Sequence, residues 1–86
     1  MHSVLFIIEK PAKPTTEQQV SWSSTLAELK TFASSDEEVE ILGENLALIQ
    51  LNKGLNSLAQ ATRISKGFRH RALFFESAPT WVISVS

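Results

Sequence analysis

Hydrophobic positions divide the chain into short runs of strand character and two longer stretches with helical spacing. The first run, Ser3 to Glu9, is an unbroken series of aliphatic and aromatic residues, which is typical of a strand buried on both faces. The other runs predict a β-hairpin over Glu38 to Leu51, a fourth strand at Arg71 to Glu76 and a fifth at Trp81 to Ser86. The pattern therefore predicts one central strand, one hairpin and two C-terminal strands.

The hairpin is the part of the sequence around which the rest is arranged. Glycine reaches positive φ easily, so Gly43-Glu44 is favoured as a two-residue turn in which Leu42 pairs with Asn45. This register places Val39, Ile41, Leu46 and Leu48 on one face, and Glu40, Leu42, Ala47, Ile49 and Leu51 on the other. Both faces of the hairpin are thus expected to carry hydrocarbon.

Helical spacing appears on either side of the hairpin. Two overlapping Thr-x-x-Gln capping boxes precede Trp22, Leu26 and Leu29, which predicts a helix from about Thr16 to Ser34. After the hairpin, Asn52 is a candidate N-cap for a second helix that Gly67 can close. Its apolar face is expected to consist of Leu55, Leu58, Ala59 and Thr62.

The element order is βαββαβ with an additional C-terminal strand, in a single domain spanning residues 1–86. This order resembles the ferredoxin-like split βαβ arrangement, an α+β fold with an antiparallel sheet and two helices on one face. The resemblance implies that the first and third strands are central. Right-handed crossovers place both helices on the same side of the sheet.

Two helices on one side leave the other face of the sheet without a cover. An exposed apolar patch larger than about 400 Å² is rare on soluble monomers, so a second copy is expected to cover the face as a homodimer. Alternatively, the segment Lys10 to Thr15 or the fifth strand covers it within one chain. The residues proposed for an interface are Ile49, Leu51, Phe74 and Trp81.

Composition narrows the function classes. The 86 residues carry a net charge of −1, which opposes wholesale attraction to nucleic acid or anionic membranes but permits local patches. The chain has no cysteine, and its longest apolar run is far too short to span a bilayer. Its N-terminus lacks the basic region and cleavage site of a signal peptide. A cytoplasmic protein without a membrane partner is expected.

Catalytic and metal-binding patterns are absent from the sequence. His2 and His70 lie far apart and form no zinc-binding spacing, and no serine lies in a Gly-x-Ser-x-Gly elbow. The three glycines are isolated and form no phosphate-binding loop. We therefore expect no catalytic residue, no metal and no cofactor, which favours a non-enzymatic protein.

Charged residues gather in two places. Five acids lie between Asp36 and Glu44, where they are most simply the solvated edge of an outer strand. The basic cluster is a candidate nucleic-acid site in which the cations contact phosphate and an aromatic ring stacks on a base, or else a solvated helix end. It consists of Arg63, Lys66, Phe68, Arg69, His70 and Arg71. The two clusters are expected at opposite edges of the sheet.

The fold-level likeness extends to two classes of small dimers. An acidic residue, Glu9, follows the first strand in a way that is similar to the CRISPR adaptation nuclease family, and the fold also resembles that of certain ribonuclease-type antitoxins. In the nuclease family an aspartate follows a tyrosine, whereas this chain reads Ile8-Glu9-Lys10-Pro11 and contains no tyrosine. The likeness covers topology and no specific motif.

Two functions of different class follow. The first is a non-catalytic homodimeric interaction or regulatory module, of the inhibitor or antitoxin kind, that acts through protein–protein contacts. The second is a small nucleic-acid-binding protein or metal-dependent nuclease that uses Glu9 and the basic cluster. A domain that binds a small ligand between subunits is a third, weaker reading, because no residue names a ligand.

Overall fold

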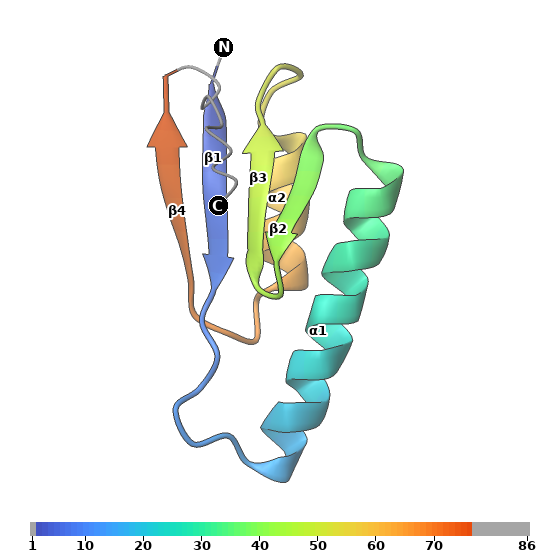
Figure 1. The fold of residues 1–86 in the computed structure, drawn as a ribbon, viewed down its shortest axis with the longest axis vertical. Helices are drawn as coiled ribbons and strands as arrows, with labels where there is room; N and C mark the ends of the chain where they lie inside the picture. The colour runs from blue at the N-terminus through green and yellow to red at the C-terminus, as the bar shows by residue number, and fades with distance from the viewer. Residues whose placement is uncertain (1, 77–86) are drawn as a thin grey trace, which may run out of the picture.

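The computed structural model describes residues 2–76 and contains four strands and two helices (Figure 1). In chain order these are β1 (Ser3–Ile8), α1 (Thr16–Ser35), β2 (Val39–Gly43), β3 (Leu46–Gln50), α2 (Asn56–Ile64) and β4 (His70–Phe75). The predicted fifth strand at Trp81 to Ser86 lies outside the described residues. The α+β class and the order of the six described elements match the sequence prediction.

The strands form one antiparallel sheet in the order β2-β3-β1-β4. The two central strands are therefore β1 and β3, and β2 and β4 lie at the edges. The two helices lie on the same side of this sheet (Figure 1). They share one core with the inward-facing residues of β1, which are Val4, Phe6 and Ile8. The sheet thus has a covered face and an opposite face, which we term the open face.

Helix α1 starts and packs as its sequence predicts. The Thr15 hydroxyl accepts a hydrogen bond from the Gln18 backbone, and the Gln18 side chain accepts one from the Thr15 N–H, which completes a capping box. Trp22, Leu26 and Leu29 lie on one side of the helix and are buried against the sheet. The cap fixes where the helix begins, and the apolar stripe fixes which side faces the core.

The hairpin turn and register differ from the prediction. The turn is Glu44-Asn45, Gly43 pairs with Leu46, and a β-bulge at Leu42 adds one residue to β2. Asn45 holds this turn, because its side chain and its carbonyl both bond to the backbone of Ile8, at 2.7 and 3.0 Å.

The bulge exchanges the faces on which the hairpin residues lie. In the structure Val39 pairs with Ile49 and Ile41 pairs with Ala47. All four point toward the helices, where Val39, Ala47 and Ile49 are buried. A shift of one residue in register inverts every side chain of a strand, so the predicted partition of the hairpin is wrong.

Helix α2 begins later than predicted. Its N-cap is Leu55, which makes no side-chain capping bond, whereas the Asn52 amide donates to Glu38 at 3.2 Å. Gly54 has φ of +94°, a left-handed conformation that interrupts any helix starting at Asn52. The buried residue of α2 is Ala61, and Leu55 is exposed.

Candidate interaction surface

The open face of the sheet carries three rows of side chains across β3, β1 and β4. Paired residues on neighbouring strands share a face, so the register defines the rows directly. The middle row consists of Leu48, Leu5 and Leu73. The neighbouring row begins with Leu46 and Ile7. The apolar members of the open face are Leu5, Ile7, Leu46, Leu48, Leu73 and Phe75. Hydrocarbon therefore covers most of this face.

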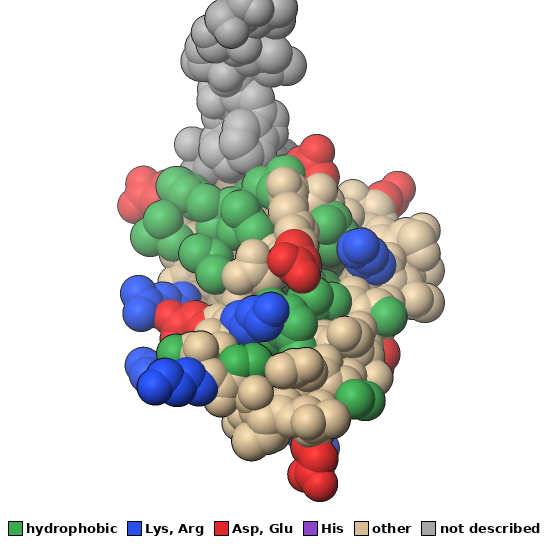
Figure 2. Space-filling view, turned by 60° about the horizontal axis from the view of Figure 1, so that its bottom comes forward, with side chains coloured by type: hydrophobic (Ala, Val, Ile, Leu, Met, Phe, Trp, Pro, Cys, Tyr) green, Lys and Arg blue, Asp and Glu red, His purple; other side chains and the backbone are tan. Residues whose placement is uncertain are grey.

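These side chains differ in how far solvent reaches them. Leu73 is 56% exposed, Leu48 is buried, and Leu5, Ile7, Leu46 and Phe75 are intermediate. Both described helices lie on the opposite side of the sheet (Figure 1). On the side of the molecule where β4 lies, Figure 2 shows hydrophobic side chains gathered beside basic ones. The open face is thus an apolar surface next to charge.

The residues predicted for an interface do not lie together on this surface. Ile49 is 0% exposed in the chain's own core, and Leu51 is half-buried after β3. Phe74 is 59% exposed on β4, but its register with Val4 places it on the covered face, beyond the reach of the helices. Trp81 lies outside the described residues. Leu46 and Leu48 were missed as open-face residues because the predicted register was one residue out.

A charged group occupies the end of the open face where β4 begins. The Glu9 carboxylate pairs with Arg71 at 2.5 Å and with Arg69 at 3.5 Å, and its side chain is 27% exposed. A backbone hydrogen bond from Glu9 to Arg69, at 2.7 Å, holds the two segments together. One carboxylate between two guanidinium groups leaves a net charge of about +1 at this corner. We term these three residues the basic corner.

The other residues of the predicted basic cluster lie away from the basic corner. The Phe68 ring packs edge-on against Trp22, with ring centres 5.2 Å apart. The His70 ring lies 5.3 Å from that of Phe6, on the covered face. Arg63 bonds to Gln60 on the same helix, and Lys66 is exposed beyond α2. The cluster is therefore divided among several surfaces, and Phe68 is not positioned to stack on a base.

The acidic residues predicted to form a solvated edge make hydrogen bonds and an ion pair with residues that follow β3. Asp36 accepts a hydrogen bond from the Ser57 hydroxyl at 2.6 Å, and Glu38 accepts one from Asn52. Lys53 pairs with Glu37 at 3.0 Å. These bonds tie the α1–β2 connection to the β3–α2 connection and to the first turn of α2. Together with exposed Glu40 on β2, the acids form what we term the acidic corner, made of Asp36, Glu37, Glu38 and Glu40.

The pKa of Asp36 lies below its ordinary value, because the Ser57 hydroxyl and then the Glu38 backbone N–H donate to its carboxylate. We expect Ser57→Ala to lower the free energy of unfolding by about 1 kcal/mol at neutral pH, a value reduced by solvent screening. A lowered folded pKa stabilises fully above the unfolded pKa, so this loss should shrink as the pH falls below about 4 and disappear once the pH is below the lowered pKa of Asp36. Urea unfolding at several pH values measures it.

Ser34→Ala is the matched control for this experiment. The Ser34 hydroxyl donates to the Thr31 carbonyl of the same helix and touches no carboxylate. Its effect on stability should therefore be small and independent of pH. An equal effect of Ser57→Ala at pH 7 and pH 3 would contradict the assigned role of Asp36.

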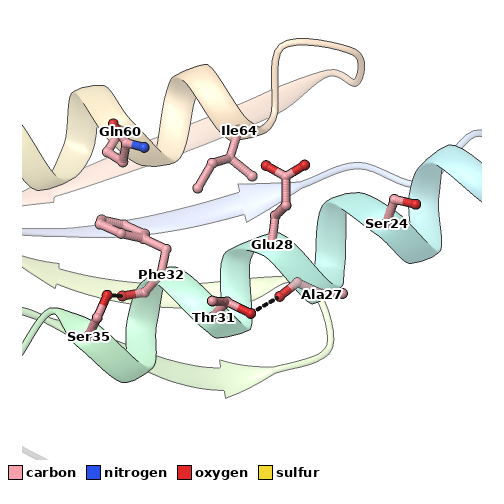
Figure 3. A pocket seen from close by; sticks show the side chains of 8 residues that line it. All are labelled: Ser24, Ala27, Glu28, Thr31, Phe32, Ser35, Gln60 and Ile64. Carbon is pink, nitrogen blue, oxygen red and sulfur yellow. Dashed lines mark hydrogen bonds between the residues drawn. The ribbon is translucent and has the colours of Figure 1, made fainter.

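A shallow groove of about 600 Å³ runs between the two helices (Figure 3). The Glu28 side chain extends from α1 toward α2 beside Ile64 (Figure 3). The hydroxyls of Thr31 and Ser35 donate to carbonyls of their own helix, and Gln60 accepts from Arg63. The polar groups of the groove are thus largely satisfied locally, and no nucleophile lies next to a base there.

Within residues 2–76, no three histidine or acidic side chains are placed to hold one metal ion. No helix in that same span has the length and apolar character needed to cross a membrane. The described part of the chain is a small α+β protein with a four-stranded antiparallel sheet and two helices. No protein family, curated protein or solved structure matches the chain.

Proposed function

We propose that the protein is a non-catalytic interaction module that acts as a homodimer packed through the open face of its sheet. The observation that supports this most directly is the apolar layer of Leu5, Ile7, Leu46, Leu48, Leu73 and Phe75 on the side opposite the helices. Burial of such a layer stabilises an assembly in proportion to the apolar area removed from water. A regulatory role, such as that of an inhibitor or antitoxin, fits a protein that acts through protein–protein contacts.

A second copy of the chain is the partner that best fits the charges around this layer. The basic corner and the acidic corner both border the open face, one on the β4 side and the other on the β2 side. A partner of one sign would match one corner and repel the other. A second copy supplies both signs, so a twofold arrangement makes each favourable contact twice.

The ferredoxin-like arrangement is part of this proposal. The sheet order β2-β3-β1-β4, with two helices on one side, supports it. In such a sheet the open face is broad, because β1 and β3 are flanked on both sides by paired strands. A fold of this kind gives a dimer a broad contact surface and leaves the hydrogen-bonding edges of β2 and β4 unused.

Nucleic-acid binding is less well supported by the same contacts. Glu9 pairs with two of the four basic side chains that were candidates for phosphate contact, and Phe68 packs on Trp22. Glu9 is thereby occupied by arginines rather than presented toward a metal ion. Fluorescence anisotropy with labelled RNA and DNA at low salt should show no binding, and salt-sensitive binding would favour the nucleic-acid alternative.

The dimer is tested by a charge placed on the open face. Leu73→Glu should convert the dimer to a monomer in size-exclusion chromatography with light scattering, because it buries a carboxylate in the contact. Val20→Glu is the control, since Val20 is a 63% exposed residue of α1 away from the open face. Both side chains are exposed in the single chain, so neither variant should unfold it. A wild-type monomer at micromolar concentration would refute the proposal.

A further inference from the structure

The two charged corners of the open face lie diagonally across it. Glu40 is on edge strand β2, at the level of Leu48, Leu5 and Leu73. Arg71 is on the opposite edge strand and pairs with Ile7, which is two residues further along β1. Arg69 is paired with Glu9, which follows Ile7 by two residues in the chain. Acid and base are therefore separated both across the strands and along them.

The separations follow from the spacing of strands and residues. Three strand intervals lie between β2 and β4, which is about 14 Å. Along the strands, Glu40 is about 7 Å from the level of Arg71 and about 13 Å from that of Arg69. A twofold axis between two stacked sheets exchanges two points only if it runs perpendicular to the line that joins them. Such an axis runs obliquely to the strands.

We infer that the dimer packs with its two sheets crossed, so that the acidic corner of each copy lies on the basic corner of the other. The oblique axis sets the strands of the two sheets at about 50° if Glu40 meets Arg71, and at about 90° if it meets Arg69. Both angles are larger than the angle of about 30° in aligned sheet packing, and the larger one corresponds to orthogonal packing. The inference rests on the proposed homodimer and specifies its geometry.

Opposite charge reversals provide the first test. Glu40→Lys places a cation opposite Arg71 in its own homodimer, and Arg71→Glu places two acids together. When the two variants are mixed, each contact is again between opposite charges. Native mass spectrometry should then show the mixed dimer in about fivefold excess over its statistical share, and the excess should fall in high salt. A statistical mixture of dimers would overturn the crossed arrangement.

Cross-linking gives a second test that does not depend on charge. The sequence has no cysteine, so Glu40→Cys, Arg69→Cys and Leu73→Cys each introduce a single thiol. Crossed sheets predict that a short bismaleimide joins the Glu40→Cys variant to the Arg69→Cys variant. A twofold axis parallel to the strands would instead place Glu40 over the partner's Leu73. On β4, Leu73 lies about 13 Å from Arg69. A Glu40→Cys variant that cross-links to the Leu73→Cys variant but not to the Arg69→Cys variant would therefore refute the inference.

The two proposals fail in different ways. If the wild-type chain stays monomeric, the homodimer itself is wrong. If it forms dimers that Leu73→Glu disrupts, but Glu40→Cys cross-links to Leu73→Cys and not to Arg69→Cys, the dimer stands and only its crossed geometry is wrong. Circular dichroism of each variant, with thermal melting, checks that the substitutions leave the fold intact.

Discussion

Phe6→Ala is expected to lower the free energy of unfolding by about 3–5 kcal/mol, enough to unfold a large fraction of so small a domain. Phe6 lies on central strand β1, is 1% exposed, and has the His70 ring 5.3 Å away. Truncation would leave a cavity between the sheet and both helices that the surrounding core cannot fill. Chemical denaturation followed by tryptophan fluorescence measures the loss, because Trp22 belongs to the same core.

Phe74→Ala is the control for this truncation. It removes the same side chain from the same face of the same sheet, but Phe74 lies on edge strand β4 and is 59% exposed. Its effect on the stability of the single chain should stay within about 0.5 kcal/mol. Similar losses for the two variants would mean that the helices cover β4 as well as β1, contrary to the structure.

The sequence predicts the elements of this fold well, because each rests on a local pattern. The unbroken apolar run of β1 predicts a central strand, and β1 is central. The Thr15 capping box and the spacing of Trp22, Leu26 and Leu29 predict the start of α1 and its buried side. Nearest neighbours in the chain determine these features, so no knowledge of the tertiary structure is needed.

The sequence does not predict the features that depend on distant contacts. Gly43 favours a turn at its own position, yet the bonds from Asn45 to Ile8 place the turn one residue later. Likewise Asn52 is a good N-cap residue by its sequence, but its side-chain amide donates a hydrogen bond to Glu38 and does not cap α2. In both cases a partner far away in the sequence outweighs a local preference of about 1 kcal/mol or less.

For the candidate surface, too, the sequence predicts what depends on local patterns and does not predict what depends on distant contacts. An apolar face on the side away from the helices follows from counting elements, since two helices on one side cannot shelter both sides of a sheet. The identity of its residues does not follow, because it depends on the register of the hairpin. Leu46 and Leu48 lie on the open face in place of Ile49, as the bulge at Leu42 requires. Similarly, the composition shows a basic cluster, but only the fold brings Glu9 between two of its arginines.

The register can be tested by placing a charge on each face of β3. Ile49→Glu is expected to unfold the protein or to cost more than about 4 kcal/mol, because Ile49 is 0% exposed beneath the helices. Under the register predicted from the sequence, the same substitution would fall on the outer face. Its effect on the fold of a single chain would then be small. Circular dichroism at low protein concentration distinguishes these outcomes.

Leu46→Glu completes the comparison on the same strand. Leu46 is half-buried on the open face, where it pairs with Ile7, so the variant should remain folded as a single chain. The expected loss is about 1–2 kcal/mol, and the dimer should weaken because the carboxylate lies in the proposed contact. The two sites lie three residues apart on one strand and differ in which face they occupy. A folded Ile49→Glu variant together with an unfolded Leu46→Glu variant would show that the sheet buries the opposite face, and the open surface would have to be assigned anew.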